Sequence, residues 1–335
     1  MFIVETQTIA VLLCCITMLC WGSWANTQKL ASKEWKFQLF YWDYSLGVLL
    51  LSLILAFTLG SMGSGGRGFA ADLQQAGLSA LGLAFLGGVV FNLANILLVV
   101  AIDIAGLAVA FPIGIGIALV QGVILNYISQ PKGNVVLLFL GVACVALAII
   151  VNAIAYRRLP AQGEKTVGKG IVISVIAGVL MGFFYGFVVS SMSEIKDGVL
   201  LDPGKLTPYT ALVLFSTGLL ASSFIWNSLV MIRPFVGKSV PFRDYVAKGS
   251  PGLHLVGILG GMIWNVGMSL NIIASPKAGP AISYGLGQGA TLIAALWGVF
   301  IWKEFKSAPQ GTNRLLGAMF VSYFVGLALI IAAKP

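Results

Sequence analysis

Ten long apolar runs, separated by short polar gaps, dominate the sequence. Each run is about 20 residues long, the length that an α-helix needs to cross the hydrocarbon core of a bilayer. The runs lack the alternation of short strands that is typical of a β-barrel. The pattern predicts spans at residues 7–28, 40–60, 78–102, 106–128, 134–155, 169–193, 208–231, 252–274, 279–301 and 312–332.

The composition explains why these runs need a membrane. Of the 335 residues, 59% are hydrophobic and 9% are charged, against roughly 25% charged residues in a soluble domain. Lys and Arg gather in the gaps, where they orient a membrane protein. The loops after odd-numbered spans hold 14 of the 20 basic residues. We therefore expect these loops in the cytoplasm and both termini outside, in a multi-pass protein of the plasma (inner) membrane.

The sequence also contains an internal repeat. Residues 86–92 read LGGVVFN and residues 259–265 read LGGMIWN, and Gly106 aligns with Gly279 at the same offset. The repeated segments lie an odd number of spans apart, so the two halves cross the membrane in opposite directions, as in many secondary transporters. We expect an all-α protein with an N-terminal five-helix repeat at 1–158, a cytoplasmic linker at 159–168 and a C-terminal five-helix repeat at 169–335.

Polar side chains inside the apolar runs are candidates for a solute site, because a polar group facing lipid is costly. The asparagines are Asn92, Asn95 and Asn265, with hydrogen bonding between helices as the alternative that stays open. Aromatic rings in mid-span can stack on a planar solute or on a sugar. The remaining candidates for solute binding are Trp21, Trp24, Tyr185, Trp264, Tyr284 and Gln288.

Other residues have different expected roles. Asp43, at the start of span two, is the candidate for proton coupling, while Glu304 is expected to be structural. Trp35 and Trp302, near helix ends, are expected to be interfacial anchors. A set of small or helix-loosening residues is expected to act in helix packing or as hinges: Gly87, Gly88, Pro112, Gly114, Gly116, Gly260, Gly261 and Gly287.

Several function classes are disfavoured by the sequence. Residues 163–170, GEKTVGKG, have nearly the spacing of a phosphate-binding loop, but glycine replaces the hydroxyl residue that binds magnesium and no strand precedes them. The cysteines lack zinc-type spacing. No nucleophile is accompanied by a base, so an enzyme is not expected. We expect no cofactor, metal, nucleotide or nucleic acid.

Several short motifs extend over nearly the whole sequence. They are Val4-Glu5, Trp21-Gly22-Ser23-Trp24, Trp42-Asp43-Tyr44, Gly87-Gly88-Val89-Val90 through Asn95, Leu125-Asn126-Tyr127, and Ala295-Leu296-Trp297-Gly298 through Glu304. Together they resemble motifs of the ureide permeases, a family of the drug/metabolite transporter superfamily that is close to the glucose/ribose and rhamnose porters.

The resemblance implies ten helices in two inverted repeats and proton-coupled uptake of a small neutral solute. For the closest relatives the solute is a ureide or nucleobase, such as allantoin or uracil, and for more distant ones a monosaccharide. We expect a symporter that works by alternating access in the bilayer as a monomer or homodimer, with a proton gradient as its energy source. A metabolite or drug exporter, or a receptor or assembly subunit that moves nothing, remains the alternative.

Overall fold

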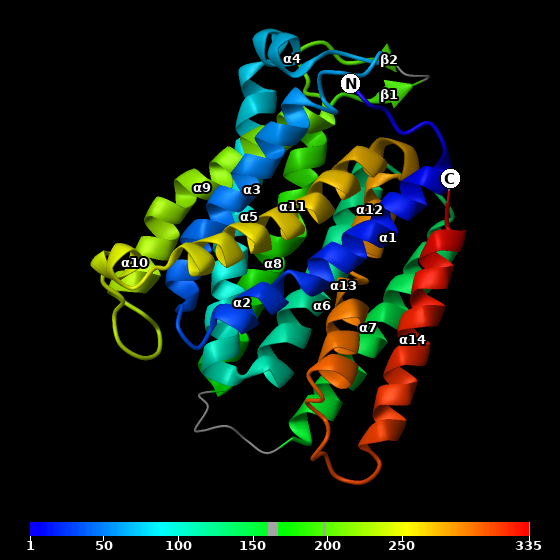
Figure 1. Ribbon diagram of the computed structural model, residues 1–335. Coiled ribbons are helices and arrows are strands. Elements are labelled where there is room, and N and C mark those ends of the chain that lie inside the picture. Colours follow the sequence, from blue (N-terminus) through cyan, green and yellow to red (C-terminus); the bar gives the residue numbers. More distant parts are fainter. Residues whose placement is uncertain (160–166, 197–198, 335) are drawn as a thin grey trace.

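The computed structural model describes residues 1–159, 167–196 and 199–334. In this part of the chain ten helices are long and apolar enough to cross a membrane, which confirms the predicted all-α polytopic fold (Figure 1). Residues 160–166 of the predicted linker, and with them part of the segment 163–170, lie outside the described residues.

The first half contains α1 (Gln7–Ser23), α2 (Ala25–Ala31), α3 (Phe37–Phe57), α4 (Phe69–Gln75), α5 (Leu78–Ala105), α6 (Leu107–Ser129) and α7 (Val135–Arg157). The second half contains α8 (Val167–Ser191), the antiparallel strands β1 (Ile195–Lys196) and β2 (Val199–Leu200), α9 (Pro208–Ile232), α10 (Arg243–Ala247), α11 (Pro251–Ala278), α12 (Pro280–Gly287), α13 (Ala290–Leu296), the π-helical turn η1 (Trp297–Ile301) and α14 (Thr312–Ala332).

Capping residues fix where several spans begin. Thr6, Asn134, Thr207 and Ser250 each accept a hydrogen bond from a backbone N–H in the first turn of the following helix. This bond satisfies a donor that has no partner within the helix. Proline opens α9, α11 and α12, where its missing N–H is not needed. The observed spans accordingly begin and end close to the predicted positions.

The first and ninth spans are each built from more than one helix. α1 gives way to α2 at Trp24. In span nine α12 ends at Gly287, α13 begins at Ala290, and η1 completes the span. Interrupted membrane helices are tolerated where they are buried in protein or line a cavity, and π turns are frequent at functional sites. We therefore expect a functional site in the space between these two spans.

Contacts between the halves follow a pseudo-two-fold pattern. α5 packs against α8 and α9, and its repeat equivalent α11 packs against α1 and α3. The turn after each of these helices is also repeated, because Gly106 and Gly279 begin the next helix with φ angles of 86° and 89°. Glycine adopts this conformation without steric cost. The internal repeat of the sequence is therefore matched in contacts and in backbone conformation.

Two glycines of the repeat let backbones of opposite halves meet. A Cβ atom added to Gly88 would lie 1.9 Å from the carbonyl oxygen of Phe215, and one added to Gly261 would lie 2.0 Å from that of Tyr44. Non-bonded carbon and oxygen atoms cannot approach so closely. α5 and α9, and likewise α3 and α11, are therefore held together through positions that accept no side chain.

The other expected packing residues have different surroundings. Pro112 lies inside α6, and Gly116 has open space where a Cβ atom would stand. Close approach to a neighbouring side chain, measured from an added Cβ atom, is found at Gly87 (2.7 Å), Gly114 (2.6 Å), Gly260 (2.4 Å) and Gly287 (2.7 Å).

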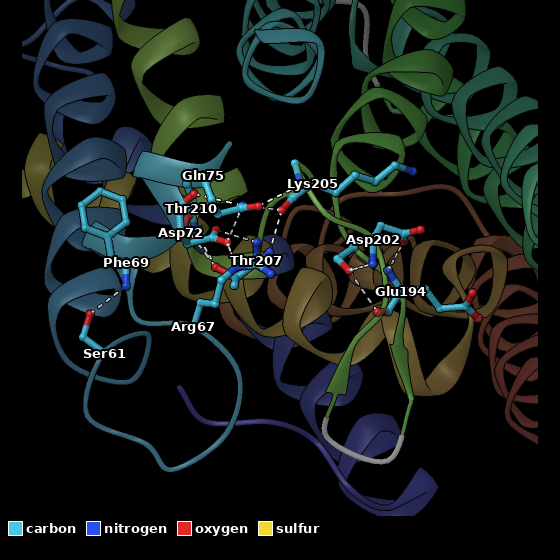
Figure 2. Close-up of polar contacts among 12 residues, drawn as sticks. Ser61, Arg67, Phe69, Asp72, Gln75, Glu194, Asp202, Lys205, Thr207 and Thr210 are labelled. Atoms are coloured by element: carbon cyan, nitrogen blue, oxygen red, sulfur yellow. Dashed lines mark hydrogen bonds and ion pairs between the residues drawn. The ribbon is translucent and has the colours of Figure 1, made fainter. Parts of the chain in front are cut away.

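Both chain termini and the loops after even-numbered spans lie at one end of the molecule (Figure 1). It is called the outer end, after the orientation that the basic residues of the sequence predict. The opposite end is called the inner end. At the outer end the buried Asp72 carboxylate accepts hydrogen bonds from Arg67 Nε (2.9 Å) and the Thr207 backbone N–H (2.7 Å). Arg67 and Gln75 also donate to the Lys205 carbonyl (Figure 2). These bonds tie the loop after span two to the loop after span six.

Candidate functional site

A cavity of 350 Å³ lies between the two halves, within the size range of small-molecule sites. Its lining comes from α1, α2, α5, α6 and α7 of the first half and from α8, α11, α13 and η1 of the second. It extends from Trp264, in the middle of α11, to Lys29 and Glu304 at the inner end. The repeat thus places a cavity at the junction between its halves.

Tryptophans form one wall of the cavity. The rings of Trp21 and Trp264 stack with their centroids 5.9 Å apart and their planes 12° apart. Trp21 Nε1 donates to the Trp264 carbonyl (3.1 Å), and Phe91 packs against the Trp264 ring at 4.6 Å. Trp24, also in the lining, lies at the junction of α1 and α2. These rings offer flat apolar surface on which a planar ring or a sugar face can pack.

Amide side chains supply the polar part of the lining. Asn95 donates one hydrogen bond to the Tyr41 hydroxyl (3.2 Å), and the buried Gln288 lies in the interruption between α12 and α13. The buried Oδ1 atom of Asn152 has no hydrogen-bond partner. Amides both donate and accept hydrogen bonds. The lining can therefore bind a neutral solute that carries donors and acceptors of its own.

The two charged residues of the lining, Lys29 and Glu304, lie together at the inner end. Lys29 Nζ is 2.6 Å from Glu304 Oε1, and the Tyr156 hydroxyl donates to Glu304 Oε2 at 2.5 Å. Lys29 also lies 4.2 Å above the centre of the Trp302 ring. Because the charges of Lys29 and Glu304 neutralise each other, the lining offers no net charge to a solute.

The predicted residues Asn92 and Asn265 do not line the cavity. The Asn92 amide donates to the Leu219 carbonyl of α9 at 3.1 Å, and the Asn265 amide donates to the Val48 carbonyl of α3 at 2.8 Å. Both side chains are buried. The structure thus places these repeat-related residues in equivalent hydrogen bonds between helices, which is the alternative that the sequence left open.

Tyr185 and Tyr284 also lie outside the lining. The Tyr185 hydroxyl donates to Asn271 Oδ1 at 2.6 Å, and the Tyr284 hydroxyl lies 3.2 Å from the carbonyl oxygens of Ala118 and Met181. Both tyrosines are fully buried. They stand behind the lining on its outer side and connect α8, α11, α12 and α6.

Asp43 is buried in a cluster of its own, away from the cavity lining. Its carboxylate accepts from Trp35 Nε1 (3.2 Å) and from the Tyr245 hydroxyl, and it lies 2.9 Å from His254 Nδ1. Burial, reinforced by this carboxylate, raises the pKa of Tyr245, so the phenol remains a donor. The interfacial role expected for Trp35 is wrong, because its side chain is 0% exposed.

Several lining residues were not expected from the sequence. Asn152 is a polar residue in an apolar run, a signal that is readable in the sequence. Trp302 and Glu304 follow the last turn of span nine, and their position depends on the backbone path after η1. Among the described residues no group of three His, Cys, Asp or Glu side chains could hold a metal ion.

Comparison with known proteins gives a consistent result. The sequence profile of the ureide permease family matches residues 40–169 and 156–333. Ureide permease 1 of Arabidopsis thaliana is 25% identical, with 100% of this chain and 99% of that protein covered. A probable glucose uptake protein of Bacillus cereus is 25% identical, with 72% of this chain and 76% of that protein covered.

One crystal structure shares the fold, with a TM-score of 0.61 at 15% identity over 97% of this chain and 98% of that chain. The family profile covers most of the chain and both halves of the repeat. The described part of the chain has ten apolar helices, with a neutral cavity between those halves. The chain therefore belongs to the ureide permease family and is a multi-pass membrane transporter of solutes.

Proposed function

We propose that this protein imports a small neutral polar solute, driven by a proton gradient, by alternating access of its two inverted halves. The observation that carries the proposal is the lining of the cavity, in which stacked tryptophans lie beside amide groups and the only charged pair is neutralised. A solute with a flat or ring-shaped body and several donors and acceptors fits this chemistry.

The relatives narrow the class of solute. The plant relative is a ureide permease and the bacterial relative a probable glucose uptake protein. A ureide or nucleobase would place its planar ring against Trp21 or Trp264, and a monosaccharide would place its apolar face there. Asn95 and Gln288 would hydrogen-bond the edge of either solute. An exporter of apolar drugs would have no need for these buried amides.

The test is uptake of labelled allantoin, uracil, glucose and rhamnose into proteoliposomes that contain the full chain. Each solute is measured with an inward proton gradient, without one, and after addition of a protonophore. We expect gradient-driven uptake of one of the four, lost with the protonophore. Binding of a solute without any flux would contradict the proposal and would favour a receptor. Efflux driven by the gradient would favour an exporter.

Asp43 remains the residue that the sequence proposes for proton coupling. Its carboxylate lies within hydrogen-bonding distance of His254 but does not line the cavity. The variant Asp43→Asn is therefore compared with the native chain in the same uptake assay. Loss of gradient-driven uptake with retained exchange of labelled for unlabelled solute would support a role of Asp43 in coupling.

A further inference from the structure

The backbone after span nine is shaped so that it returns Glu304 to the cavity. Within η1 the Trp302 N–H bonds to the Trp297 carbonyl, the spacing of a π turn. Lys303 follows with a φ angle of 52°, the one positive φ of a non-glycine residue in the described chain. Such strained positions cluster at functional sites. The reversal brings the carboxylate back over the end of its own span.

Glu304 has partners from two other elements. Lys29 of α2 lies 2.6 Å from one carboxylate oxygen, and Tyr156 of α7 donates to the other. Lys303 and Lys306 flank Glu304 in sequence, and both are exposed. The Glu304 side chain is 28% exposed and lines the cavity, so water and protons can reach it.

The charge beside Glu304 depends on how far spans one and nine are apart. While the two residues are paired, Lys29 places a positive charge 2.6 Å from the carboxylate. If the inner ends separate, the carboxylate loses this charge and faces the rings of Tyr156 and Phe305, which pack 4.8 Å apart. An apolar surrounding favours the neutral acid. By linkage, proton binding to Glu304 favours separation of the two spans, and proton release favours their closure.

The outer end carries a matching ion pair with reversed polarity. Lys132, after span four, lies 3.9 Å from Glu194, after span six, and Lys132 also donates to the Pro276 carbonyl (3.3 Å). Spans four and six are the repeat equivalents of spans nine and one. The same ends of equivalent helices are therefore joined by a Lys–Glu pair at both ends of the molecule, as expected if these ends close the solute path.

We infer that Glu304 is the proton-binding group of this transporter and that its ion pair with Lys29 is the inner gate that the proton releases. This inference rests on the proposed proton-coupled transport. In the outward-facing state of the transport cycle, a proton from the outside binds the Glu304 carboxylate and breaks its pairing with Lys29. The inner ends of spans one and nine then part. Release of the proton to the cytoplasm restores the carboxylate, which pairs with Lys29 again and closes the gate.

The test measures the distance between spans one and nine without any solute. Spin labels are attached to Lys33→Cys and Lys306→Cys, both exposed positions at the inner end, in the full chain with its four native cysteines replaced by alanine. Distance distributions are recorded in lipid at acidic and at alkaline pH. We expect a longer distance at acidic pH in this parent chain. The variants Glu304→Gln and Lys29→Gln should show the long distance at both pH values.

A matched variant serves as the control. Glu194→Gln removes the outer carboxylate and should keep the pH-dependent change. Asp43→Asn is measured beside it, because Asp43 is the other candidate for the proton site. A change that persists in Glu304→Gln, or a parent chain without any change, would overturn the inference. A change that is lost in Asp43→Asn and kept in Glu304→Gln would assign the proton to Asp43. Because no solute is present, failure here leaves the uptake result untouched, and failure of uptake leaves this measurement interpretable.

Discussion

Two asparagines one helical turn apart in α5 have different surroundings. Asn92 is 0% exposed and bonds to Tyr41, Leu219, Ser222 and Ser223. Asn95, on the next turn, lines the cavity. One residue joins helices and its neighbour is available to a solute, although both are amides in the same apolar run.

Replacing each of these asparagines by alanine should separate the two roles. Asn92→Ala removes a buried hydrogen-bonding group and should lower the free energy of unfolding by about 1–3 kcal/mol, with little change in the KM for uptake. Asn95→Ala should raise the KM several-fold with a smaller loss of stability. Thermal unfolding in detergent and uptake kinetics measure the two quantities. An unchanged KM for Asn95→Ala would exclude it from the solute site.

The Trp21–Trp264 stack yields a second prediction at this scale. Trp264→Ala removes the central ring of the wall and should weaken solute binding by about tenfold or more, as truncation of a buried tryptophan at a binding site commonly does. Trp264→Phe should keep much of the affinity, because a flat ring remains. Trp226→Ala, a tryptophan outside the cavity lining, is the matched control. Equal effects of both alanine variants on binding would contradict the assignment.

The sequence identified these residues by type but could not sort them. Both asparagines are polar residues in an apolar run, yet Asn92 donates to a carbonyl of span seven and Asn95 to a hydroxyl of span two. Which helix face meets α9 and which meets the cavity follows from packing between the halves. Hydrophobic periodicity is weak when nearly every position is apolar, so it does not indicate which face of α5 meets α9 and which meets the cavity.

Among the helices, the close contacts of α5 with α9 and of α3 with α11 rest on glycines. Gly88→Ala and Gly261→Ala should each destabilise the protein by about 1–3 kcal/mol, because the new methyl group would force two backbones apart. Gly116→Ala is the control, since open space surrounds that position; it should be neutral or slightly stabilising, because alanine favours helix. Thermal unfolding compares the three variants. A loss of stability in Gly116→Ala equal to that in Gly88→Ala would contradict this account.

The number of spans and their bounds could be predicted because each depends on local features, such as apolar length, caps and prolines. The path of span nine could not. Its interruption at Gln288 lies where the chain packs closely against α1, since an added Cβ atom on Gly289 would meet Met18 and one on Gly287 would meet Trp21. The π turn before Trp302 changes the path again. Glu304, expected to be structural, is therefore found at the cavity.

For the whole molecule, alternating access requires that the outer ends of spans four and six separate. Bridging Lys132→Cys and Glu194→Cys with a short bifunctional thiol reagent should therefore abolish uptake, while each single variant treated alike should keep it. A cleavable reagent allows recovery of uptake after reduction. Full activity of the bridged protein would show that these ends need not move. The measurement uses the same proteoliposomes as the solute assay.

The repeat is visible in the sequence from LGGVVFN and LGGMIWN. The structure adds hydrogen-bonded serine pairs between the halves that this sequence match does not reveal. Ser45 bonds to Ser223 at 3.2 Å, and Ser52 bonds to Ser216 at 2.6 Å. Each pair joins α3 to α9 across the junction of the halves. Such pairs could not be predicted, because they link spans two and seven, where the halves share little recognisable sequence.

The bond from Asn92 to Leu219 has a consequence for how the chain is made. The Asn92 amide oxygen has a partner in span two, the Tyr41 hydroxyl, but the acceptors of its NH2 group belong to span seven. Span three leaves the ribosome well before span seven, so until then water, lipid headgroups or the insertion machinery must accept from this NH2 group. Assembly of the first half is therefore complete only after the second span of the second half has been synthesised. A nascent chain that stalls between these spans should be a substrate for membrane quality control.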